Sequence, residues 1–84
     1  MTNNSETINT VLVTAVGAPP GLNALRALQE SGRYHLVASD ADRMSPSLYT
    51  AGVRGHVLPK ANHPDYIPAL MRLIKAEKID LVIP

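Results

Sequence analysis

Four short aliphatic segments alternate along the chain with segments of helical periodicity, and this alternation restricts the possible folds more than any other feature. The four segments lie at residues 8–16, 34–39, 55–59 and 80–84, and each is rich in Val, Leu, Ile or Ala. Strands that alternate with helices predict a parallel sheet with right-handed crossover connections. We therefore expect a three-layer α/β fold, half of a doubly wound sheet, with strand order 3-2-1-4.

The first helix is predicted over residues 22–31. Leu22, Leu25 and Leu28 share one face of this segment, and Gly32 is a natural residue to end it. The connection at residues 43–52 is expected to be a loop that contains one helical turn after Pro46.

The second main helix is predicted to follow Asp65 as its N-cap residue. This start places Pro68 at the third helical position, where its missing N–H removes no hydrogen bond within the helix. Spacing of i, i+3, i+4 and i+7 then predicts a buried stripe of Ile67, Leu70, Met71 and Ile74.

Composition narrows the class of protein further. The chain has 84 residues, enough for one small domain, and 8 Lys and Arg balance 7 Asp and Glu, so we expect no nucleic-acid partner. The absence of cysteine excludes disulfides and thiolate metal sites, and the three histidines lack the spacing of metal ligands. No apolar run approaches the roughly 20 residues of a membrane span. We expect a flexible tail at residues 1–7, a domain at residues 8–84, and a cytoplasmic protein without a membrane partner.

The turn Gly17-Ala18-Pro19-Pro20-Gly21 joins the first strand to the first helix. Open α/β sheets bind ligands at this place, where backbone N–H groups and the helix dipole favour an anion. The dinucleotide fingerprint Gly-x-Gly-x-x-Gly does not fit, because its first and third glycines are replaced by Ala15 and Pro20. The two prolines also lack N–H groups. The turn is either a rigid structural element or a contact for an anion or substrate, and we expect the second.

Asp40 ends the second strand, roughly where dinucleotide-binding folds place the acid that binds ribose. Asp40 and Asp42 would equally serve to cap and solvate a loop. The residues give no pair of carboxylates that qualifies as a general acid and base.

Three features, taken together, carry a resemblance to a known family. They are the turn at residues 17–21 opening a Leu/Ala helix, the motif Asp40-Ala41-Asp42 followed by residues 46–49, and a strand ending in Pro59 followed by a helix and residues 79–84. Over residues 10–84 the chain resembles the amino-terminal, Rossmann-like domain that precedes the ATP-grasp fold in carbamoyl-phosphate-synthase-like ligases. It departs at Ala15, where relatives commonly have glycine, and at Gly52, where they often have an acidic residue.

The resemblance implies a function for the longer protein rather than for this domain alone. Such ligases use ATP and Mg²⁺ to activate a carboxylate, which an amine, thiol or other nucleophile then attacks. ATP and Mg²⁺ are held mainly by later domains, so the implied partners are those ATP-grasp domains and a small carboxylate substrate. The resemblance assigns no catalytic residue here, and it assigns a substrate- or phosphate-binding role to the following residues: Gly17, Ala18, Pro19, Pro20, Gly21 and Asp40. It also leads us to expect that the natural protein continues beyond Pro84.

Two other functions stay open at this point. The strand-turn-helix with Asp40 beyond it is also found in NAD(P)-binding domains of oxidoreductases. A non-catalytic interaction module is the third alternative. Half of a doubly wound sheet exposes an edge strand and apolar surface, so we expect the chain to self-associate.

Overall fold

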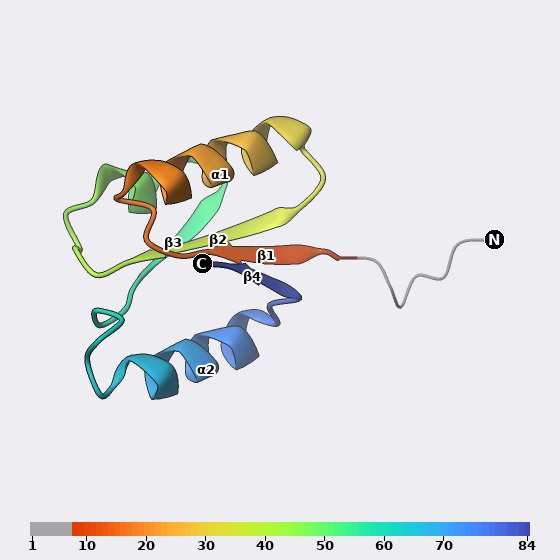
Figure 1. The fold of residues 1–84 in the computed structure, drawn as a ribbon. Coiled ribbons are helices and arrows are strands. Elements are labelled where there is room, and N and C mark those ends of the chain that lie inside the picture. Colours follow the sequence, from red (N-terminus) through yellow and green to blue (C-terminus); the bar gives the residue numbers. More distant parts are fainter. Residues whose placement is uncertain (1–7) are drawn as a thin grey trace.

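A four-stranded parallel sheet lies between two helices in the computed structural model, which describes residues 8–84 (Figure 1). The strand order is β3-β2-β1-β4, which confirms the predicted topology. The predicted tail, residues 1–7, lies outside the described residues. In chain order the elements are β1 (Thr10–Val13), α1 (Pro19–Ser31), β2 (His35–Asp40), the 3₁₀ helix η2 (Pro46–Tyr49), β3 (Val53–Val57), α2 (Tyr66–Glu77) and β4 (Leu81–Ile83).

The register of the sheet brings the carboxyl ends of its strands to one edge. Val13, the last residue of β1, pairs with Ala38 of β2 and with Ile83 of β4. On the far side of β2, Asp40 pairs with Val57, the last residue of β3. Residues that directly follow the four strands therefore lie close together.

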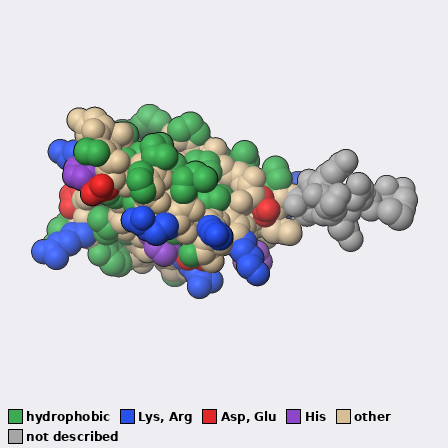
Figure 2. All heavy atoms as spheres, turned by 90° about the horizontal axis from the view of Figure 1, so that it is seen from below, with side chains coloured by type: hydrophobic (Ala, Val, Ile, Leu, Met, Phe, Trp, Pro, Cys, Tyr) green, Lys and Arg blue, Asp and Glu red, His purple; other side chains and the backbone are tan. Residues whose placement is uncertain are grey.

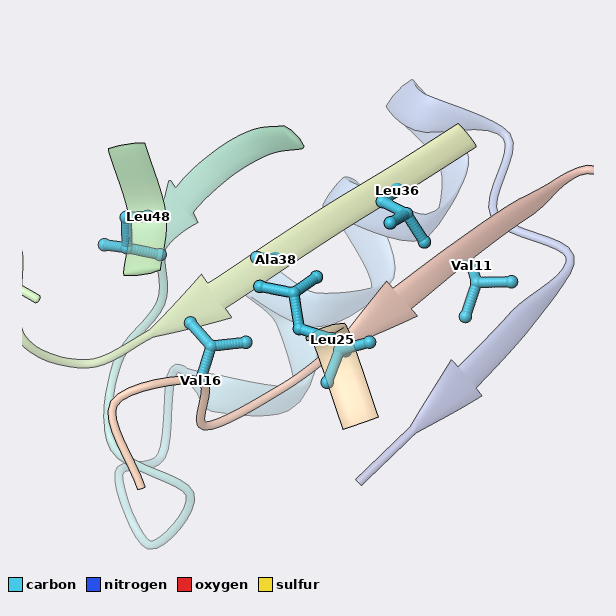
Figure 3. Close-up of a cluster of buried hydrophobic side chains, with 7 residues drawn as sticks. Val11, Val16, Leu25, Leu36, Ala38 and Leu48 are labelled. Carbon is cyan, nitrogen blue, oxygen red and sulfur yellow. The ribbon is translucent and has the colours of Figure 1, made fainter. Parts of the chain in front are cut away.

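Each face of the sheet carries its own hydrophobic core. Leu25 of α1 lies against the side chains of β1 and β2 (Figure 3). The buried residues on this face are Val11, Val13, Val16, Leu25, Leu36, Ala38 and Leu48. The buried residues on the α2 face are Leu12, Val37, Leu58 and Leu73. Alternate residues of β1 and β2 thus point to opposite cores, as strands covered on both faces require.

The predicted boundaries of α1 and of the first strand need correction. The strand ends at Val13 rather than at residue 16, because Ala15 takes a left-handed conformation with φ of 54° and turns the chain out of the sheet. The helix begins at Pro19 rather than at residue 22, with Ala18 as its N-cap. Proline fits both of the first two helical positions, since their N–H groups have no partner inside the helix.

The predicted apolar stripe of α2 is wrong at two of its four positions. Ile67 and Met71 are 60% and 58% exposed, whereas Leu73 is 6% exposed. The face that packs on the sheet consists of Tyr66, Ala69, Leu70 and Leu73. This helix carries two apolar stripes that share Leu70, and spacing alone does not choose between them. In the space-filling view from the α2 side, hydrophobic side chains gather on the surface, with Lys and Arg side chains beside them (Figure 2).

Neither helix of residues 8–84 has the length and apolar character needed to cross a membrane.

Candidate functional site

Gly17 and Asp40, which the sequence analysis singled out separately, are in direct contact. The Gly17 N–H donates to Asp40 Oδ1 at 3.3 Å, and the Asp42 N–H donates to Asp40 Oδ2 at 3.3 Å. A Cβ added at Gly17 would lie 2.7 Å from Asp40 Oδ2, so only glycine lets the carboxylate come this close. The Asp40 side chain therefore connects the end of β2 to the turn that precedes α1.

Three other N–H groups at this turn are also used within the chain. Val16, Ala18 and Leu22 donate to backbone carbonyl oxygens at 3.1, 3.1 and 3.0 Å. Pro19 and Pro20 have no N–H to donate. A phosphate approaching this turn meets few of the backbone donors that such turns offer in dinucleotide-binding folds.

Gly21 is buried in the first turn of α1, against the backbone that follows β1. A Cβ at this position would lie 2.7 Å from the Thr14 carbonyl oxygen and would also overlap the Ala15 carbonyl oxygen. In dinucleotide-binding folds the third glycine of the fingerprint permits the same close packing of helix on strand. Gly21 serves this packing function although it stands one residue later in the sequence.

A crevice of about 390 Å³ opens where the four strands end. It is lined by Thr14, Ala15, Ser39, Asp40, Ala41, Leu58, Pro59, Lys60, Ala61, Tyr66 and Pro84. The lining residues follow or end β1, β2, β3 and β4, and Tyr66 begins α2. β2 and β3 follow β1 on one side of the sheet, and β4 is then added on the other side of β1. Open α/β sheets bind ligands where the strand order changes side in this way. This crevice is the candidate functional site.

The structure places the predicted site residues in different parts of the molecule. Asp40 lines the crevice. Gly17 lines a different cavity of about 430 Å³, between α1 and the segment that contains η2. Ala18, Pro19 and Pro20 are exposed at the start of α1, and within residues 8–84 they line neither of these two cavities.

Four polar residues of the crevice escaped the sequence analysis: Thr14, Ser39, Lys60 and Tyr66. A usable signal existed for them. Parallel strands end at the same edge of a sheet, so the residues at or just after the end of each predicted strand were candidates. The glycine and acid motifs do not include these side chains.

His56 and His63 have side-chain contacts within the chain. His56 Nε2 lies 2.8 Å from Glu77 Oε2, and Arg54 Nε lies 3.4 Å from Glu77 Oε1. These contacts join the edge strand β3 to the end of α2. The Asp65 N–H donates to His63 Nδ1 at 3.0 Å, in the turn that precedes α2.

Asp80 joins β4 to β1 at the opposite edge of the sheet. Its Oδ2 accepts the N–H groups of Thr10 at 2.9 Å and of Asn9 at 3.0 Å. These two bonds, that of Thr10 first, stabilise the ionised carboxylate and lower the pKa of Asp80 below its ordinary value of 3.8.

Fold and crevice together define a class: a Rossmann-like α/β domain with a cleft at the carboxyl ends of parallel strands. The model of the family described as "PylC-like, N-terminal domain" matches residues 11–84, which is most of the chain. The chain therefore belongs to this family, which is one of the families of amino-terminal domains of ATP-grasp ligases. No curated protein and no solved structure matched the chain.

Proposed function

We propose that this chain is the substrate-side, amino-terminal domain of an ATP-grasp ligase that joins a carboxylate to an amine or a thiol. The observation that carries the proposal is the family match over residues 11–84. The position of the crevice supports it, because a cleft at the carboxyl ends of the strands faces whatever domain packs on that edge. The narrower, carbamoyl-phosphate-synthase-like assignment is part of this proposal.

In this proposal, ATP and Mg²⁺ are held by other domains of the ligase. A triphosphate requires a cradle of N–H groups or cationic side chains, and Mg²⁺ requires carboxylate oxygens. In the turn before α1 the N–H groups of Val16, Gly17 and Ala18 bond within the chain. Among residues 8–84, no cluster of three or more His, Cys, Asp or Glu is arranged to hold a metal ion. These residues do not fit Mg²⁺-ATP, and we assign them no step that involves it.

The role we propose for Asp40 and the turn is to shape one wall of the substrate site. Asp40 holds the turn through the Gly17 N–H, and its own backbone carbonyl oxygen accepts the Leu58 N–H at 3.0 Å. Asp40 thus connects the ends of three elements around the crevice. Any contact of residues 17–21 with substrate or phosphate would then come mainly from their exposed surface and not from free backbone donors.

The test uses the natural gene product that contains this chain. It is incubated with ATP, Mg²⁺, a panel of small carboxylates and hydroxylamine as a general amine nucleophile. We expect release of ADP only when a carboxylate is present, together with formation of the matching hydroxamate. ADP release that is independent of every carboxylate and amine or thiol acceptor tested would contradict the proposal.

A titration of the chain with NADH, followed by fluorescence, distinguishes the oxidoreductase alternative. We expect no saturable binding, since the turn lacks the fingerprint glycines at Ala15 and Pro20. Saturation at micromolar NADH would favour a dinucleotide-binding domain over the ligase domain proposed here.

A further inference from the structure

Lys60 is the cationic side chain of the crevice, and Asp40 is the acidic one. The two Asp40 oxygens each accept a backbone N–H, from Gly17 and from Asp42. Within residues 8–84 the ion pairs involve Arg54, His56 and His63, and none of them involves Lys60. The ammonium group of Lys60 is therefore available to a ligand.

The backbone around Lys60 is held in place on both sides. Pro59 precedes it and has a fixed φ. The Lys60 carbonyl oxygen accepts the His63 N–H at 2.8 Å, and the His63 carbonyl oxygen accepts the Tyr66 N–H at 3.0 Å. Two successive turns thus fix Lys60 relative to Tyr66, the other polar side chain on this wall of the crevice.

The opposite wall is formed by residues that already have partners or are nearly inaccessible. The Thr14 hydroxyl donates to the Ile83 carbonyl oxygen at 3.3 Å, and Ser39 is 2% exposed. Beside them Ala15 holds a left-handed backbone conformation, which is unfavourable for alanine and is found preferentially at functional sites. Lys60 is the group on this cleft best able to bind a charged ligand.

We propose that Lys60 is an anion-binding residue of the crevice and that it receives the carboxylate or phosphoryl group of the bound ligand. An ammonium group next to a largely apolar cleft attracts an oxyanion and leaves the ligand body in contact with Leu58, Pro59 and Tyr66. The identity of the ligand as a ligase substrate depends on the function proposed above, but the binding of an anion does not.

The experiment is an amide NMR titration of the ¹⁵N-labelled chain with acetate and, separately, with inorganic phosphate, at ionic strength held constant with chloride. We expect saturable shifts at Ala15, Ala41 and Ala61, with dissociation constants on the order of millimolar for a single charged contact. Lys60→Gln should weaken binding by about fivefold or more, and Lys60→Arg should retain it. Tighter binding of acetate would assign the site to a carboxylate, and tighter binding of phosphate would assign it to a phosphoryl group.

Lys78→Gln is the matched control, because Lys78 follows the far end of α2 and does not line the crevice. It should leave both titrations unchanged. Shifts that do not saturate, or that are equal in the chain and in Lys60→Gln, would overturn the proposal. The unliganded spectrum of each variant verifies that it is folded.

The two proposals fail separately. Lys60-dependent anion binding in a gene product that releases no carboxylate-dependent ADP would remove the ligase function and keep the site. Carboxylate-dependent ADP release with the same carboxylate KM in the wild type and in Lys60→Gln would keep the ligase function and remove the site.

Discussion

The two faces of the sheet are packed in different ways. On the α1 face, helix and strand meet backbone to backbone, because Gly21 lies against the Thr14 and Ala15 carbonyl groups and Gly55 of β3 lies against the Leu48 carbonyl group. On the α2 face the contacts are made by side chains, with Leu73 at their centre. The α2 helix also leaves Ile67 and Met71 exposed.

This difference gives the two walls of the crevice different kinds of packing. Backbone contacts have no rotamer freedom, so the α1 half gives the crevice a rigid wall that includes Ala15 and Asp40. The α2 half forms the wall of the crevice that contains Lys60 and Tyr66. Fewer residues are buried in the core of this half than in the core of the α1 half. We infer that the α1 half is the more rigid of the two.

The largest expected effect comes from Gly21→Ala. The new Cβ would overlap two backbone carbonyl oxygens, which cannot turn away as a side chain can. We expect a loss of about 3 kcal/mol or more in the free energy of unfolding, because overpacking forces α1 away from β1. Chemical denaturation followed by circular dichroism measures this loss.

Gly32→Ala is the control for that substitution. Gly32 ends α1 with φ of 66°, and nothing lies within 4 Å of an added Cβ. Only the left-handed backbone opposes alanine there, so the loss should be about 1 kcal/mol. A loss for Gly21→Ala no greater than that for Gly32→Ala would contradict the close packing, because Gly21 has no positive φ that opposes alanine.

The second effect compares a leucine from each face. Leu25→Ala removes a side chain that is 1% exposed within the larger core, and Leu73→Ala removes one that is 6% exposed within the smaller core. We expect losses of about 3 kcal/mol and about 2 kcal/mol in the free energy of unfolding, since a rigid surrounding closes less of the cavity. A greater loss for Leu73→Ala, measured by urea unfolding, would contradict the assignment of the rigid half.

Much of the fold was predictable from the sequence, and the reason differs between the two faces. The strand order follows from the alternation of elements and from the handedness of crossovers, which are rules for the whole chain. The face of α1 was predictable because Leu25 has leucines three residues away on both sides. The buried face of α2 was not, because two apolar stripes compete and contact with Leu12 and Val37 selects the one with Leu73.

Of the predicted site residues, Asp40 lines the crevice and residues 17–21 do not. The end of β2 was identified through Asp40, but the contact of its carboxylate with the Gly17 N–H depends on how the two connections meet in space. Lys60 and Tyr66 follow the third predicted strand, at the edge where the sheet order β3-β2-β1-β4 places the crevice. To predict that both residues line the crevice, one must know the sheet order and also the path of the turn before α2.

A smaller effect of opposite sign is expected at the two non-glycine residues of positive φ among residues 8–84. Ala15 at the end of β1 and Lys78 after α2 both have φ of 54°. Ala15→Gly and Lys78→Gly should each raise the free energy of unfolding by about 0.5 to 1 kcal/mol, because relief of the left-handed strain exceeds the entropy lost by glycine.

Thermal unfolding of the two glycine variants provides the check, with Ala61→Gly as a control at a residue without positive φ. The control should be slightly less stable than the wild type. If only Lys78→Gly gained stability, the strain at Ala15 would have to be offset by other contacts in the rigid half.

The smallest effect concerns the hydrogen bonds between the residue that precedes β4 and the start of β1. Asp80→Asn removes the carboxylate that accepts the Thr10 and Asn9 N–H groups. Because the pKa of Asp80 is lowered in the folded chain, its contribution is present above the ordinary value of 3.8 and is lost as the pH falls below it. Asp80→Asn should therefore be less stable than the wild type at about pH 6, and the difference should shrink as the pH falls below 3.8. Asp65→Asn, at an exposed carboxylate 3.8 Å from His63, is the comparison. The free energy of unfolding of both proteins is measured in urea across this pH range. A difference between them that does not change with pH would mean that the charge of Asp80 is not what stabilises the contact.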